Sequence, residues 1–67
     1  MSELTCRLKV RRAERDLTQE ALAKGVGVSR QTIISIERGD YLPSALLALK
    51  LARFFGRPFE EVFSLRE

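Results

Sequence analysis

The sequence predicts an all-α fold of five short helices. Two observations predict it: apolar residues recur at helical spacing along five segments, and glycine or proline separates these segments. We expect helices at roughly 6–15, 19–25, 30–37 and 43–55, and a short fifth turn that begins at Pro58. The chain ends alternate weakly, which leaves room for a small terminal β-hairpin-like sheet.

Length and composition predict one small domain over residues 1–67, near the lower size limit for a self-sufficient core. No apolar run approaches the roughly 20 residues that a membrane span needs, and the start lacks the apolar stretch of a signal peptide. Cys6 is the only cysteine, so an internal disulfide is excluded, which fits a reducing cytoplasm. We therefore expect a cytoplasmic protein without membrane contact.

The excess positive charge lies in the N-terminal half of the chain. The net charge is +3, and residues 1–38 hold eight Lys and Arg against five Asp and Glu. Residues 39–67 hold four of each sign. Such asymmetry favours a polyanion as partner, although a solvated basic face would give the same count.

Residues 17–39 read as two short helices joined by a tight turn. Thr18 and Ser29 are good N-cap residues, and Gly27 can adopt the left-handed conformation that ends the first helix. The second helix has an apolar stripe on one side and polar residues on the other. This layout allows a small basic protein to place the second helix in the major groove of DNA.

A family pattern is visible in the segment LTQEALAKGVGVSRQTIISIERGDYLPS and its continuation LLALKLARFFGRPFEEVF. Both resemble the lambda-repressor-like (Cro/repressor, or Xre) helix-turn-helix family, and the resemblance covers roughly residues 6–63. The length and the ending look most like the short dimeric regulators of the cytolysin-repressor type. The resemblance implies a five-helix domain that binds double-stranded DNA, a transcriptional regulator and most often a repressor. One departure is Gly25, which replaces a good helix former at a cost of up to about 1 kcal/mol.

The resemblance also implies which residues contact DNA. The family's base readers correspond to Arg30, Gln31, Ile34 and Ser35, and its phosphate contacts to Thr18, Gln19, Arg38 and Tyr41. The chemistry is suitable, because Arg can bond guanine and Gln can bond adenine through two hydrogen bonds. Gln19 can also brace Gln31. Alternatives stay open: Gln19 can merely cap its helix, and Arg30 can reach a phosphate. Ile34 and Ser35 can lack a role.

Arg12 and Glu37 form an expected structural ion pair. In the family, an arginine of the first helix pairs with the glutamate that ends the third, and both positions match. Such a pair would hold the reading helix against the first helix. The alternative is two independent surface charges, which would contribute almost nothing to stability.

The expected fourth helix, SALLALKLARFF, is apolar nearly all round. One stripe is expected in the core: Ala45, Ala48, Leu49, Ala52 and Phe55. A second stripe lacks cover in so short a chain: Leu47, Leu51 and Phe54. We expect a homodimer to cover it, with the interface extended by Phe59, Phe63 and Leu65. The family resemblance adds a sheet with Leu4 near Leu65. The alternative is that these side chains close around the monomer core.

Catalysis is not expected. The chain has no histidine, one cysteine and no set resembling nucleophile, base and orienting residue. Metal ligands do not cluster in the sequence, so we expect no metal and no cofactor. No ligand-binding domain is visible, so no small-molecule ligand is expected. Two alternative functions remain, namely the antitoxin of a toxin–antitoxin pair and a protein-interaction module on the same fold.

Overall fold

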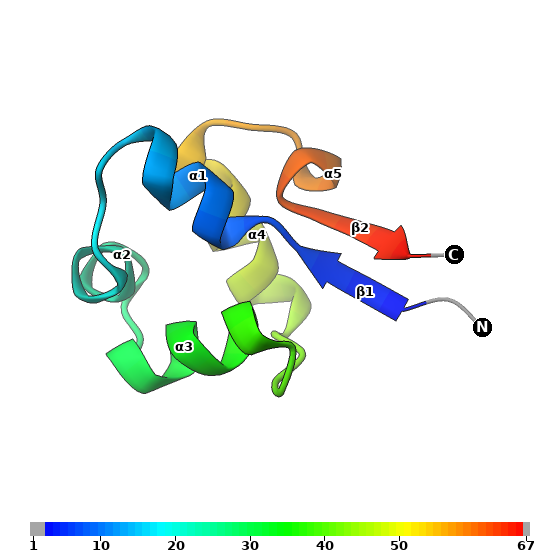
Figure 1. Cartoon of the computed structure of the whole chain (residues 1–67), viewed down its shortest axis with the longest axis horizontal. Helices are drawn as coiled ribbons and strands as arrows, with labels where there is room; N and C mark the ends of the chain where they lie inside the picture. The colour runs from blue at the N-terminus through cyan, green and yellow to red at the C-terminus, as the bar shows by residue number, and fades with distance from the viewer. Residues whose placement is uncertain (1–2, 67) are drawn as a thin grey trace.

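The computed structural model describes residues 3–66, which form five helices and a two-stranded sheet (Figure 1). The elements follow in the order β1 (Glu3–Cys6), α1 (Leu8–Glu14), α2 (Gln19–Val26), α3 (Arg30–Arg38), α4 (Ala45–Phe55), α5 (Phe59–Val62) and β2 (Phe63–Arg66). The five expected helices are confirmed, with ends that differ from expectation by no more than two residues. None of the helices among residues 3–66 is long and apolar enough to cross a membrane.

Local capping sets the ends of the two central helices. The side chain of Thr18 accepts a hydrogen bond from the backbone of Ala21 at 3.0 Å, and Ser29 accepts one from Thr32 at 3.2 Å. At the other end of α2, Gly27 has a φ of 78°, a left-handed conformation that glycine adopts without strain. The short turn between α2 and α3 therefore follows from the residues at its two ends.

The terminal sheet forms within one chain. Strand β1 pairs antiparallel with β2, and the register places Leu4 opposite Leu65 and Cys6 opposite Phe63. The hydroxyls of Thr5 and Ser64 lie 2.8 Å apart across the pair. The expected contact of Leu4 with Leu65 is therefore confirmed. Figure 1 shows the two strands extending to one side of the helices.

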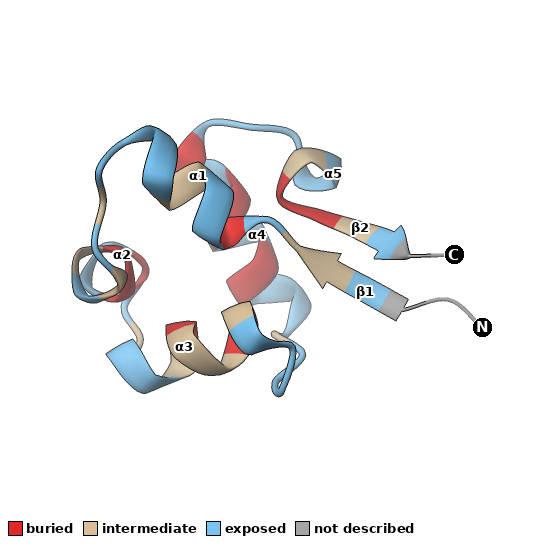
Figure 2. Ribbon diagram, in the orientation of Figure 1, coloured by how far each residue is buried: buried red, intermediate tan, exposed pale blue. Residues whose placement is uncertain are grey.

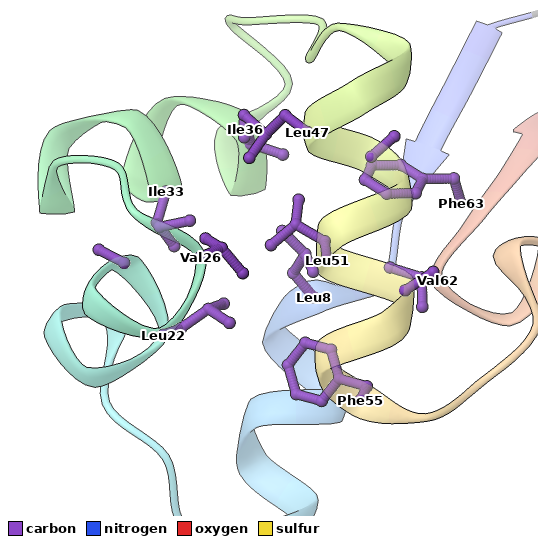
Figure 3. Packing of buried hydrophobic residues seen from close by; sticks show 13 residues of the cluster. Leu8, Leu22, Val26, Ile33, Ile36, Leu47, Leu51, Phe55, Val62 and Phe63 are labelled. Carbon is purple, nitrogen blue, oxygen red and sulfur yellow. The ribbon is translucent and has the colours of Figure 1, made fainter.

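The core lies where α1, α2 and α3 meet α4, and it continues to the start of β2 (Figures 2 and 3). Its residues are all apolar: Leu8, Leu22, Ala23, Val26, Ile33, Ile36, Leu47, Ala48, Leu51, Ala52, Phe55, Val62 and Phe63. Full burial of one large apolar side chain contributes about 1.5–3 kcal/mol. This cluster therefore holds the helices in their relative positions.

The expected inward face of α4 was partly wrong. Leu47 and Leu51, expected at a dimer interface, point into the core, whereas Ala45 and Leu49, expected inside, are exposed, Leu49 to 57%. Phe63, expected at a dimer interface, is buried as well.

The sequence carried one sign of the outer face of α4. Lys50 and Arg53 lie at helical spacing with Leu46 and Leu49, and this side of the helix faces solvent. The opposite side is buried and holds Leu47, Ala48, Leu51, Ala52 and Phe55.

Gly25 makes room for an aromatic ring of α4. A Cβ atom at this position would clash with Cε2 of Phe54, because it would lie closer than two non-bonded carbon atoms can approach. Phe54 is half-buried, packs against the core and meets the ring of Phe55 edge to face at 5.3 Å. Gly25 therefore has a packing reason, beyond the cost in helix propensity that the sequence suggested.

We predict that Gly25→Ala destabilises the protein although alanine favours helix formation. Displacing the Phe54 ring should cost about 1–3 kcal/mol, and the gain in helix propensity should offset up to about 1 kcal/mol of it. Urea unfolding measures the net effect. In a Phe54→Ala background, the same substitution should become stabilising, because the ring is gone. An equal effect of Gly25→Ala in both backgrounds would contradict this packing account.

Candidate nucleic-acid interface

Helix α3 lies with one face on the core and the other in solvent. Ile33 and Ile36 are buried, and Val28 in the preceding turn packs against the core. Arg30 and Gln31 are exposed, whereas Ile34 and Ser35 are half-buried. Figure 3 shows α3 at the edge of the apolar cluster, with Ile33 and Ile36 directed toward α4. The outer face of α3 is thus free to meet a partner.

The expected base-reading residues divide between two hollows. Gln31 and Ser35 share an open hollow on the outer face of α3, lined by Ser29, Gln31, Thr32, Ser35, Asp40 and Tyr41. We name this hollow the reading hollow. The amide Nε2 of Gln31 donates to the hydroxyl of Ser35 at 3.5 Å, a long contact that aligns the two side chains. The structure brings these two residues together with Tyr41, which was expected at a phosphate.

Arg30 lies in a second hollow, at the N-terminus of α2. Its lining consists of Arg12, Thr18, Gln19, Glu20 and Arg30. The guanidinium of Arg30 and the first backbone N–H groups of α2 can donate hydrogen bonds to an anion such as phosphate, whereas Glu20 adds a negative charge at the rim. Arg30 therefore lies with the expected phosphate contacts Thr18 and Gln19, away from the reading hollow.

Arg12 and Glu37 lie in contact between α1 and the end of α3. The guanidinium of Arg12 donates from Nε to Oε2 of Glu37 at 2.6 Å and from Nη2 to Oε1 at 3.0 Å. Arg12 also donates to the carbonyl of Leu17 at 2.9 Å. Gln19 donates from Nε2 to Oε1 of Glu37 at 3.1 Å, where the sequence suggested Gln31 as its partner. Helices α1, α2 and α3 thus meet at one carboxylate, and Arg12 also joins the segment before α2 to this network.

Burial and hydrogen bonding act in opposite directions on Glu37. Burial of the carboxyl, whose side chain is 7% exposed, would raise its pKa. The hydrogen bonds from Arg12 and Gln19, with the charge of Arg12, outweigh burial and leave the pKa below its ordinary value. The hydrogen bond to Glu37 likewise raises the pKa of Arg12. Both partners are therefore charged at neutral pH.

The end of α3 carries a second ion pair that sequence reasoning missed. Nε of Arg38 lies 3.4 Å from Oδ2 of Asp40, and both side chains are well exposed. Arg38 was expected at a phosphate, and the structure places an acidic residue beside it. The order Arg38, Gly39, Asp40 was the available sign, because a glycine that ends a helix turns the chain back toward the last turn.

The structure also bears on metal binding and on the reactivity of Cys6 in β1. Among residues 3–66, no three His, Cys, Asp or Glu side chains gather closely enough to hold a metal ion. Burial raises the pKa of Cys6 to about 11. The thiol is therefore protonated at neutral pH and is a weak nucleophile.

Comparisons with known proteins agree with this geometry. A family model described as Helix-turn-helix matches residues 8–62. An uncharacterized HTH-type transcriptional regulator of Methanocaldococcus jannaschii is 60% identical over 57 residues, which cover 85% of this chain and 86% of that protein. The transcriptional repressor RstR of the cryptic phage CTXphi, from Vibrio cholerae, is 43% identical over 53 residues. That match covers 79% of this chain and 48% of RstR.

Solved structures show the same architecture. A crystal structure of a protein from Bacteroides fragilis has a TM-score of 0.82 at 26% identity and covers 92% of this chain and 100% of its own. The restriction-modification controller protein C.AhdI from Aeromonas hydrophila has a TM-score of 0.77 at 34% identity, over 82% of this chain and 83% of its own. The fold is therefore lambda-repressor-like, as the sequence predicted.

We predict that Arg12 and Glu37 are energetically coupled. A double-mutant cycle with Arg12→Met and Glu37→Gln, followed by urea unfolding, should give a coupling energy of about 1–3 kcal/mol. Because the pKa of Glu37 is lowered in the folded protein, its ionised form stabilises the fold. This contribution to the free energy of unfolding is present above the ordinary pKa of 4.5 and is lost as the pH falls through the lowered pKa. Glu37→Gln should lack this loss. Additive single effects would contradict the coupling.

Proposed function

Since the chain belongs to the helix-turn-helix family of DNA-binding transcriptional regulators, we propose that it is a repressor that binds a near-palindromic operator as a homodimer. The observation that carries this proposal is the position of α3, which is fixed to the core by Ile33 and Ile36 and presents Gln31 and Ser35 outward. A polar helix face held in this way fits the major groove. Members of this family act by binding and are not enzymes.

The repressor assignment rests on two likenesses. RstR, which is 43% identical over the shared segment, is a transcriptional repressor. The length and ending of this chain resemble the short dimeric regulators of the cytolysin-repressor type. A small protein seated on an operator excludes other proteins from the same DNA, so binding alone is sufficient for repression.

The two hollows divide the proposed DNA contacts. Gln31 and Ser35 read base edges from the reading hollow, with Ile34 at the rim of the same helix face. The second hollow takes a phosphate through Arg30, Gln19 and the N-terminus of α2, which Thr18 caps. Arg38 and Tyr41 add phosphate contacts beyond the end of α3. Arg30 thereby moves from the base readers to the phosphate contacts.

The proposed dimer uses the outer side of α4 and α5. Leu46 and Leu49 of α4 are 65% and 57% exposed, and with Phe59 of α5 they form the apolar part of an open groove. We name these three residues the α4–α5 face. The groove is also lined by Lys50, Arg53 and Arg57. Exposed Leu65 and Leu4 on the terminal sheet offer further apolar surface. To reach both half-sites of the operator, the two-fold dimer has to set two copies of α3 about 34 Å apart, one turn of DNA.

We predict opposite kinds of defect from two substitutions at the DNA face. Gln31→Ala should cost about 1–3 kcal/mol on a selected operator and relax the preference at one or two base pairs, because a base contact is lost. Arg38→Ala should weaken binding to all sequences alike and reduce the salt slope by about 1, whereas Arg38→Lys should keep the slope. Fluorescence anisotropy at several salt concentrations measures both. Unchanged operator binding by Gln31→Ala would refute the assigned reading face.

We predict that Leu49→Lys dissociates the dimer and sharply weakens operator binding. The new charge would enter a contact already lined by Lys50, Arg53 and Arg57, so it would be buried without an opposite charge. Val10→Lys is the matched control, since Val10 of α1 is 53% exposed and lies outside the α4–α5 face. Sedimentation at micromolar concentration gives the oligomeric state. A wild-type species near 7.6 kDa that binds one operator as a single copy would exclude the dimer. A protein without salt-sensitive DNA binding would favour the interaction-module alternative, because the antitoxin alternative also binds DNA.

A further inference from the structure

An acidic side chain stands at the end of the reading hollow. Asp40 lines this hollow together with Gln31 and Ser35, although α3 itself ends at Arg38. Its side chain is 63% exposed, so most of the carboxylate is free to meet a partner. An acidic group is unexpected on a surface that would approach the phosphates of DNA, since like charges repel.

The backbone fixes Asp40 relative to α3. Its N–H donates to the carbonyl of Ser35 at 2.9 Å, and the N–H of Gly39 donates to the carbonyl of Ile36 at 3.1 Å. This pair of hydrogen bonds is the Schellman motif, in which glycine takes the left-handed conformation, here with a φ of 81°. Asp40 is therefore held against the last turn of α3 and does not belong to a free loop.

The chemistry of DNA leaves few partners for this carboxylate. An ionised aspartate only accepts hydrogen bonds, and the phosphate oxygens likewise only accept. In the major groove the available donors are the exocyclic amino groups of cytosine and adenine. Adenine also presents N7, an acceptor that would face a carboxylate unfavourably, whereas cytosine presents only its N4 amino group at that edge.

We infer that Asp40 is a further specificity-determining residue, whose carboxylate accepts a hydrogen bond from the N4 amino group of a cytosine beside the bases that Gln31 and Ser35 read. This inference rests on the proposed DNA binding through α3. Arg38, 3.4 Å from the carboxylate, partly neutralises it and limits its repulsion by the backbone. Where no amino group lies within reach, Asp40 faces acceptors alone and opposes binding.

The test is selection of binding sites from a random duplex library with wild type, Asp40→Asn and Asp40→Ala. Wild type should select a cytosine at one position of each half-site. Asp40→Ala should lose that preference, and Asp40→Asn should weaken it, because asparagine keeps one acceptor oxygen without the charge. Glu14→Gln is the matched control for the change in charge, because Glu14 ends α1 on the opposite side of the helices from α3 (Figure 1). This control should keep the cytosine.

A second arm of the test changes the DNA base and compares wild type with Asp40→Ala. The selected cytosine is replaced by 2-pyrimidinone, which lacks the amino group, and wild-type affinity should fall about five- to tenfold. Affinity of Asp40→Ala should not respond to this replacement. If both Asp40 variants bind all duplexes more tightly with unchanged base preferences, Asp40 is a repulsive charge only and the inference is overturned. If wild type binds no duplex at any salt concentration, the proposed function fails, and the inference fails with it.

Discussion

The partly buried ion pair of Arg12 and Glu37 is the interaction on which the DNA-facing surface depends. It joins α1 to the last turn of α3, and the same side chains bond the carbonyl of Leu17 before α2 and the amide of Gln19 within it. A charge largely removed from water is stable only when it is paired, so removal of one partner would leave the other without its counter-charge. The hydrogen bonds of this pair form only when α1, the segment before α2, α2 itself and the end of α3 hold their relative positions. The pair therefore helps to fix the angle between α2 and α3.

Helix α4 fixes the same pair of helices from the apolar side. Its buried residues meet α2 and α3, and Phe54 fits over the backbone of α2 only because residue 25 has no side chain. Arg15 then connects α4 to the end of α1, since its guanidinium donates to the carbonyls of Phe54 and Phe55 at 3.3 and 2.6 Å. A polar contact on one side and apolar packing on the other leave the outer face of α3 as the surface free for recognition.

Sequence reasoning succeeded where the cause of a structure is local. The caps at Thr18 and Ser29 lie within three residues of the groups they bond, so helix ends could be predicted closely. It failed where the cause is a distant neighbour. On α4 it gave too little weight to Lys50 and Arg53, which mark the solvent side at helical spacing, because Leu46 and Leu49 on the same side are apolar. The reason for Gly25 lies in a ring from another helix. Arg12 and Glu37 were paired by family resemblance, because no spacing rule connects two residues so far apart in the chain.

The mixed charge at the end of α3 bears on how so small a domain can discriminate between DNA sequences. Contacts to phosphate strengthen binding to every sequence alike, and the genome offers a great excess of wrong sites. Adding basic residues would therefore raise affinity without raising the ratio of right to wrong binding. An acceptor such as Asp40 acts in the other direction, since it opposes binding wherever a donor is missing. In a homodimer each such contact occurs twice. A modest ratio of binding constants between the right and the wrong base pair in one half-site is therefore squared over the whole operator.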